Sequence, residues 1–245
     1  DLFGNEVRMG DRITWSIASS CGECFFCSNT LPQKCEQLAK YGHERLETRG
    51  LVGGLAKHCR LMPGTAICRI PDSLTDGQAC PASCCTSTAV AALRTAGTIR
   101  GTSVVVLGAG SLGLTAAAMS LQQGAETVFL ADVDEARLRF ADALTGCVTV
   151  SVADGDRKLR ERIADCTSGR GVDIVLEMTG STDAAESGVD LLRIGGRLIL
   201  VGAVFPGRPM ELSAENLVRK LLRVEGVHNY RPEDLRTAIE FLESA

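Results

Sequence analysis

The sequence predicts an α/β protein in which a doubly wound parallel sheet follows a smaller antiparallel β region with a metal-binding loop. Two observations carry this prediction. From residue 102 onward, short apolar runs alternate with helical segments, as in a parallel sheet covered by helices on both faces. Before it, four cysteines fall within residues 21–35, and β-rich runs flank them. A chain of 245 residues is long enough for one large domain or two small ones.

The N-terminal part is predicted to be antiparallel β with long loops. Runs rich in β-formers occur at 11–19, 51–61 and 65–70. The cysteine loop and a polar stretch, 36–50, separate the first two runs. An alanine-rich helical pattern then covers 75–96, and the domain boundary is expected within it.

The C-terminal part is predicted to form the parallel sheet, with right-handed crossovers. Strands are expected at 102–107, 127–132, 172–177, 196–201 and 222–227. Helices are expected at 111–123, 134–144, 156–166, 182–193, 213–221 and 232–244.

Composition excludes several classes of protein. A net charge of -4, scattered Lys and Arg and ten aromatic residues give no nucleic-acid-binding face. The longest apolar run, 104–121, contains three glycines, which favours a strand turning into a helix over a membrane span. No signal peptide is visible, and the odd count of eleven cysteines argues against a disulfide scaffold. We expect a cytoplasmic protein that binds no membrane.

A glycine-rich turn follows the first strand of the second half. Gly108, Gly110 and Gly113 form G-x-G-x-x-G after an apolar strand and at the start of a helix. The first glycine permits the tight turn, the second lets the backbone approach a pyrophosphate, and the third lets the helix pack on the strand. The alternative is an ordinary glycine turn.

An acidic residue completes the pattern of a Rossmann domain. Asp132 ends the next strand, nineteen residues after Gly113, where a carboxylate accepts hydrogen bonds from both ribose hydroxyls. Its charge would repel the 2′-phosphate of NADP, so NAD is the predicted cofactor. An ordinary surface aspartate is the alternative.

The cysteines Cys21, Cys24, Cys27 and Cys35 have the spacing C-x2-C-x2-C-x7-C. Four thiolates suit a tetrahedral zinc ion, and a closed shell leaves no position for a substrate. Such a site stabilises a loop rather than performing chemistry. An iron–sulfur cluster and two disulfides are the alternatives.

A zinc lobe followed by a dinucleotide-binding domain resembles the zinc-containing medium-chain alcohol dehydrogenase family along essentially the whole chain. Within the family, the chain is similar to the phosphonate-catabolism-associated alcohol dehydrogenases. Four stretches carry the resemblance: "GDRITWSIASSCGECFFCSNTLPQKC", "GTAICRIPDSL", "PASCCTSTAVAALRTAG" and "VVVLGAGSLGL".

The resemblance implies a partial GroES-like catalytic domain with a structural zinc lobe over 1–80 and an NAD-binding Rossmann domain over 81–245. It implies that Cys84 is a ligand of the catalytic zinc and that Thr88 packs near the nicotinamide. The positions that match the family's cofactor site are Gly108, Gly110, Leu112, Gly113, Asp132 and Arg137. In the family, catalytic zinc polarises the alcohol oxygen while a hydride passes to the nicotinamide.

The chain departs from the family in its catalytic zinc ligands. The family takes a Cys and a Gly-His-Glu motif from upstream of the lobe, whereas the twenty residues before Cys21 contain neither Cys nor His. Gly42-His43-Glu44 follows the lobe instead, so it is predicted to be an ordinary loop, and His58 is predicted to lie on a strand. The chain is therefore expected to be part of a longer one and inactive as given.

Six further cysteines are expected to be small buried residues: Cys59, Cys68, Cys80, Cys85, Cys147 and Cys166.

Three functions remain in competition. The first is a zinc- and NAD-dependent alcohol dehydrogenase that acts on a small alcohol or aldehyde. The second is a non-catalytic zinc- and NAD-binding module, and the third is a quinone reductase relative, which the cysteine lobe and Cys84 argue against. The resemblance also implies a homodimer or homotetramer that pairs through 222–227. Resemblance to the subgroup alone suggests a phosphonate-bearing alcohol as the substrate.

Overall fold

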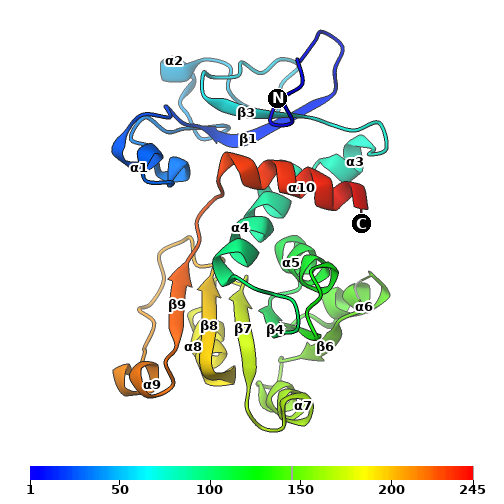
Figure 1. Cartoon of the computed structure of the whole chain (residues 1–245), viewed down its shortest axis with the longest axis vertical. Coiled ribbons are helices and arrows are strands. Elements are labelled where there is room, and N and C mark those ends of the chain that lie inside the picture. Colours follow the sequence, from blue (N-terminus) through cyan, green and yellow to red (C-terminus); the bar gives the residue numbers. More distant parts are fainter. Residues whose placement is uncertain (145, 245) are drawn as a thin grey trace. The chain divides into compact units, whose positions relative to one another are not determined.

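The computed structural model describes residues 1–144 and 146–244, and the chain divides into two compact units. The N-terminal unit contains Asp1–Thr88 together with the segment that begins at Asn229, and the sheet unit contains Ala89–His228. The chain thus leaves the first unit and returns to it (Figure 1).

The N-terminal unit is built on a three-stranded antiparallel sheet in the order β2-β1-β3. The strands are β1 (Ile13–Ser19), β2 (Ala39–Lys40) and β3 (Thr65–Arg69). Ala18 pairs with Lys40, and Thr14 pairs with Cys68. The antiparallel β region predicted from the sequence is confirmed for β1 and β3, whereas β2 lies in a stretch predicted to be a loop.

The helical stretch predicted over 75–96 is divided into three short elements. Together with the other helices of this part of the chain, the elements are α1 (Phe25–Ser28), the 3-10 helix η1 (Pro32–Lys34), α2 (Leu46–Arg49), α3 (Asp76–Ala79), the π-helix η2 (Ala82–Thr86) and α4 (Ser87–Ala96). Thr75 and Gln78 form a capping box at the start of α3. The division falls at Pro81, since proline has no N–H to continue a helical ladder.

The strand predicted over 51–61 is wrong. These residues form no strand, and the side chains of Leu51 and Leu55 are exposed. Gly53 and Gly54 interrupt the run with two positions that have no side chain to pack, which weakens a strand. His58 therefore lies in a loop instead of on a strand.

The sheet unit is a six-stranded parallel sheet in the order β6-β5-β4-β7-β8-β9, which confirms the doubly wound α/β class. Its strands are β4 (Ser103–Leu107), β5 (Thr127–Asp132), β6 (Val148–Ser151), β7 (Val172–Glu177), β8 (Leu192–Leu200) and β9 (Arg223–Gly226). Its helices are α5 (Ser111–Gln122), α6 (Glu135–Leu144), α7 (Arg157–Thr167), α8 (Thr182–Leu191) and α9 (Ala214–Arg219). Strand order reverses between β4 and β7, and ligands of such sheets bind at this switch point.

One core cluster of the sheet unit lies where apolar side chains of α7 and α8 meet the sheet. Leu159 and Ile163 of α7 belong to one buried cluster with Val105 and Phe129 of the strands. Every residue of β4 is buried, so this strand is fixed on both faces.

Strand β6 was not predicted. It has four residues, of which Thr149 and Ser151 are polar, and it pairs only with β5 at the edge of the sheet. Such a short, half-polar edge strand gives a weak apolar signal.

None of the described helices combines the length and the apolarity that a bilayer span requires. The apolar run 104–121 forms β4, the glycine turn and most of α5.

The C-terminal helix α10 (Pro232–Ser244) has the predicted bounds, but it belongs to the N-terminal unit. It buries Leu235, Ala238 and Ile239, and it contacts η2, β3, β1 and α3. The compact units therefore differ from the domain boundaries predicted at 1–80 and 81–245.

One tyrosine connects three elements of the N-terminal unit. The hydroxyl of the buried Tyr230, just before α10, accepts a hydrogen bond from the Ile17 N–H of β1 at 2.8 Å. The same hydroxyl donates a short hydrogen bond to the carbonyl of Ser83 in η2. Burial raises the pKa of Tyr230 well above its usual value, so the hydroxyl keeps its proton at neutral pH.

We predict that Tyr230→Phe lowers the free energy of unfolding by about 1–3 kcal/mol, because it leaves two partly buried backbone groups without this partner. Urea denaturation followed by circular dichroism measures the change. An unfolding midpoint equal to that of the unmodified chain would show that the hydroxyl is not needed.

Candidate functional site

The four clustered cysteines converge in a loop between β1 and β2. Their sulfur atoms all lie within 4.8 Å of one another. The Sγ of Cys21 is 3.5 Å from that of Cys35 and 4.0 Å from that of Cys27, and the Sγ atoms of Cys24 and Cys35 are 3.9 Å apart. A tetrahedral zinc–thiolate site with bonds of about 2.3 Å places its sulfurs about 3.8 Å apart. The cluster therefore matches a four-thiolate zinc site.

Backbone N–H groups point at these sulfurs. Cys21 N–H and Gln37 N–H donate to the Sγ of Cys35 at 3.2 and 3.3 Å. Hydrogen bonds from the backbone of Cys27 and Glu36 lower the pKa of Cys24 to about 6. Loss of hydration, reinforced by the neighbouring thiols, raises the pKa of Cys27 to about 12. Zinc binding would deprotonate all four thiols, and the bound cation would then balance the repulsion between the thiolates.

The structure does not pair the cysteines as disulfides. Each member of the cluster is a free thiol, and sulfur separations of 3.5–4.0 Å exceed the S–S bond length of about 2.05 Å. All four ligand positions come from protein thiols, which is typical of a closed structural zinc site without an open position for a substrate.

We predict that the purified chain carries about one zinc ion, and that Cys24→Ser loses it because a hydroxyl is a poor zinc ligand. Elemental analysis at neutral pH measures the occupancy, and it should fall at lower pH as protons compete for the thiolates. Cys166→Ser, at an exposed cysteine outside the cluster, is the matched control and should keep its zinc. Full occupancy in the Cys24 variant would contradict the assignment.

The glycine turn lies at the carboxyl end of β4 and opens α5. Gly108 has a φ of 104°, and a Cβ there would lie 2.9 Å from the Thr179 side chain. A Cβ at Gly113 would lie 1.8 Å from the carbonyl oxygen of Gly108, so only glycine lets α5 approach the turn this closely. A Cβ at Gly110 would meet nothing within 4 Å. Open space therefore lies beside the first residues of α5, where N–H groups attract anions.

The predicted ribose-binding acid lies beside this turn. Asp132 is 7% exposed, and its Oδ2 accepts a hydrogen bond from the Ala109 N–H at 2.6 Å. Its Oδ1 accepts from the Asp134 N–H at 2.9 Å. Arg137, on α6, places a guanidinium nitrogen 3.8 Å from the Asp132 carboxylate. A carboxylate has further lone pairs, so hydroxyl groups of a ligand can still bind to it.

A pocket of about 420 Å³ opens next to Asp132. It is lined by residues at the carboxyl ends of β4, β5 and β7 and by residues of α7 and α8, among them Gly108, Asp132, Asp156, Thr179, Ser181 and Asp183. Its three carboxylates, each of which is ion-paired with an arginine, can accept hydrogen bonds from hydroxyl and amine donors of a ligand. The size and polarity suit a sugar and a base.

Thr179, Ser181 and the preceding Glu177 were not among the site residues predicted from the sequence. One signal is present in the sequence: Glu177 is an acidic residue at the end of an apolar strand. The structure places that strand, β7, beside β4, which precedes the glycine turn. Sequence alone does not show that the two strands are neighbours.

We predict that alanine has different effects at two glycines of the turn: it lowers stability at Gly113 and cofactor affinity at Gly110. Gly113→Ala forces α5 away from the turn and should cost roughly 2 kcal/mol or more of stability. Gly110→Ala should change stability by less than about 0.5 kcal/mol. It should, however, weaken binding of NADH, because its methyl group fills space beside the N-terminus of α5. Thermal unfolding and NADH titration separate the two effects; equal stability of both variants would contradict the packing argument.

The residues expected at a catalytic zinc stand apart from any ligand cluster. Cys84 is exposed in the π-helix η2, and the hydroxyl of Thr88 donates to the Cys84 carbonyl at 2.6 Å. Among the described residues, the lobe is the one group of three or more ligating side chains that comes together. The roles of Cys84 and Thr88 therefore stay predictions.

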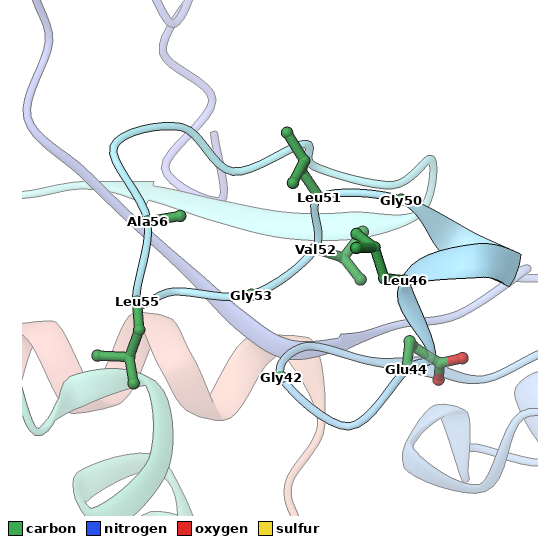
Figure 2. Close-up of a pocket in the computed structure, with 9 residues that line it drawn as sticks. All are labelled: Gly42, Glu44, Leu46, Gly50, Leu51, Val52, Gly53, Leu55 and Ala56. Atoms are coloured by element: carbon green, nitrogen blue, oxygen red, sulfur yellow. The ribbon is translucent and has the colours of Figure 1, made fainter.

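The Gly42-His43-Glu44 motif borders a second hollow, of about 260 Å³, in the loop between β2 and β3. Figure 2 shows its lining of glycines and aliphatic side chains, with Glu44 at one side. The Glu44 carboxylate accepts a hydrogen bond from Lys40 N–H at 3.0 Å and lies 3.7 Å from Arg49. This acid is engaged by its own loop.

The expectation that the remaining cysteines are buried holds for Cys68 alone. Cys80 and Cys166 are exposed, and Cys59, Cys85 and Cys147 are half-buried. The expectation was wrong for these five because cysteine is small enough to sit at any depth, so residue type alone does not fix burial.

Comparison with protein families finds a match to the model described as "zinc-binding dehydrogenase" over residues 111–244. A sorbitol dehydrogenase of Halalkalibacterium halodurans is 27% identical over 96% of this chain and 66% of its own length. An L-threonine 3-dehydrogenase of Shewanella halifaxensis is 29% identical over 92% of this chain and 63% of its own. The chain thus spans slightly less than two thirds of these relatives.

Among solved structures, an alcohol dehydrogenase of Thermotoga maritima superposes with a TM-score of 0.94 at 29% identity. The superposition covers 100% of this chain and 68% of the other. Both the parallel sheet and the small antiparallel sheet therefore belong to one known architecture.

Proposed function

Because this chain belongs to the zinc-binding dehydrogenase family, we propose that it is the zinc-lobe and cofactor-binding part of an enzyme that transfers a hydride between an alcohol and NAD. The observation that carries the proposal is the glycine turn beside a pocket of about 420 Å³, with the Ala109 N–H of the turn donating a hydrogen bond to the Asp132 carboxylate at 2.6 Å. Substrates named for the relatives differ, so the substrate class proposed here is a small alcohol or its aldehyde or ketone.

The glycine turn and the pocket suit different parts of the cofactor. The free N–H groups at the start of α5, next to Gly110, suit the pyrophosphate. The pocket beside Asp132, with its three carboxylates, suits the adenosine, whose ribose hydroxyls and amino group are donors. The negative charge of Asp132 would repel a 2′-phosphate. Arg137, whose positive charge would attract the phosphate, lies 3.8 Å from the Asp132 carboxylate and is ion-paired with it.

When bound, zinc and NAD supply Lewis-acid polarisation of the alcohol oxygen and acceptance of the hydride. The four lobe cysteines fit zinc as a structural ion, and this chain's own contribution at that site is to fix the loop between β1 and β2. For the catalytic ion, Cys84 belongs to no group of three or more ligating side chains among the described residues. We therefore expect no alcohol oxidation by these 245 residues alone.

Self-association is proposed through β9. This strand is at the end of the sheet order, and it pairs with β8 on one side. Most of its side chains are exposed. Pairing of β9 with its copy in a second chain would continue the sheet and cover an edge that otherwise invites aggregation.

The cofactor proposal is tested by titrating the chain with NADH and with NADPH, followed by the fluorescence of the reduced nicotinamide. NADH should bind about tenfold or more tightly than NADPH, a difference of roughly 1.4 kcal/mol. Asp132→Asn should reduce this preference, because it removes the charge that repels the 2′-phosphate.

Glu135→Gln, at an exposed acid on α6, is the matched control and should keep the preference. Binding of neither nucleotide would reject the proposed function. Equal binding of both by the unmodified chain would reject NAD as the preferred cofactor.

A further inference from the structure

Glu177 is a fully buried carboxylate at the last position of β7. Its Oε1 accepts three hydrogen bonds, from Thr179 N–H at 2.6 Å, Thr179 Oγ1–H at 2.6 Å and Gly180 N–H at 2.7 Å. Its Oε2 is also buried and has no hydrogen-bond partner among the described residues. All three hydrogen bonds that the Glu177 carboxylate accepts therefore come from the loop that follows the strand.

This arrangement is costly for stability. A buried carboxylate loses its hydration, and within the described part of the chain no Lys, Arg or His forms an ion pair with Glu177. An apolar side chain at the same place would be cheaper to bury. A role for Glu177 should therefore be sought in what the loop does.

The loop Met178–Ser181, called here the β7–α8 loop, forms part of the wall of the cofactor pocket. Thr179 and Ser181 both line the pocket. The Thr179 Oγ1 accepts a hydrogen bond from the Ser181 N–H at 2.9 Å, and the Ser181 side chain caps α8. One hydrogen-bonded chain therefore runs from Glu177 through Thr179 to the start of α8.

Packing limits this loop on two sides. A Cβ at Gly180 would lie 2.6 Å from the Gly202 carbonyl oxygen, so the end of β8 touches the loop. On the other side, a Cβ at Gly108 would lie 2.9 Å from the Thr179 methyl group. Movement toward either neighbour is blocked, so a loop released from Glu177 would move into the pocket or out toward solvent.

We propose that Glu177 is a positioning residue for the cofactor: it holds the β7–α8 loop so that Thr179 and Ser181 form the wall against which the adenosine part of a dinucleotide binds. The inference rests on the proposed function, since it concerns the same pocket. It adds that cofactor affinity depends on a carboxylate that faces the loop rather than the ligand.

The test compares Glu177→Met, which keeps the side-chain length and removes the acceptor, with Glu177→Gln, which keeps an acceptor oxygen. Dissociation constants are measured for NADH and for ADP-ribose, at a temperature where circular dichroism shows each variant folded. Glu161→Met, the same substitution at an exposed site on α7, is the control.

Glu177→Met should weaken both ligands at least tenfold, Glu177→Gln should recover most of the affinity, and the control should bind as the unmodified chain does. A purely structural role would lower the melting temperature and leave both constants unchanged, which would overturn the inference. Loss of NADH binding with ADP-ribose unchanged would also overturn it, because the adenosine wall would then be intact.

If Glu177→Met does not fold, Thr179→Val decides instead, since it removes the hydroxyl that connects Glu177 to Ser181. It should weaken ADP-ribose binding about threefold or more, and an unchanged constant would overturn the inference. If the unmodified chain binds neither ligand, the proposed function fails, and this inference fails with it.

Discussion

The hydrogen bond between the Asp132 carboxylate and the Ala109 N–H, 2.6 Å long, is the interaction on which the candidate cofactor site depends. It connects the end of β5 to the turn that follows β4. It thereby holds the turn in a conformation in which Gly108 has a φ of 104°. With the turn fixed, Gly113 lets α5 approach it closely, and the first N–H groups of that helix have no acceptor within the helix. The same carboxylate is then part of the pocket wall. One buried acid thus holds the turn and lines the pocket that is proposed for the ribose.

The two candidate sites of the chain differ in the way their ligand positions are filled. The cysteine lobe supplies all four positions from its own thiols, so it can stabilise a loop but cannot admit a substrate. The glycine turn and its pocket leave space and free donors for a ligand. The proposed hydride transfer would need a further metal site, and among the described residues no second group of three or more ligating side chains comes together. Structural metal and cofactor binding are therefore the functions that these residues themselves support.

Features set by local spacing could be predicted from the sequence. The C-x2-C-x2-C-x7-C run and the G-x-G-x-x-G turn bring their members together over a few residues, and strands such as β5 and β7 have the expected bounds. Features set by distant contacts could not. The β-rich run at 51–61 pairs with no strand among the described residues, and it forms a loop in which Leu51 and Leu55 are exposed and Val52 is buried. Helix α10 has the expected bounds, yet its apolar face packs on β1 and β3, which lie far from it in the sequence. Glu177 lies near the glycine turn because β7 pairs with β4, and this pairing is not apparent from the sequence.

The most direct test of this account is a titration of ¹⁵N-labelled protein with NAD, followed by the shifts of its backbone amide resonances. The account predicts that the largest shifts fall on Gly108–Gly113, on Asp132 and its neighbours and on Thr179–Ser181, while the amides of the cysteine lobe stay in place. Shifts centred elsewhere, or none at saturating NAD, would contradict the assignment of the glycine turn as the cofactor site.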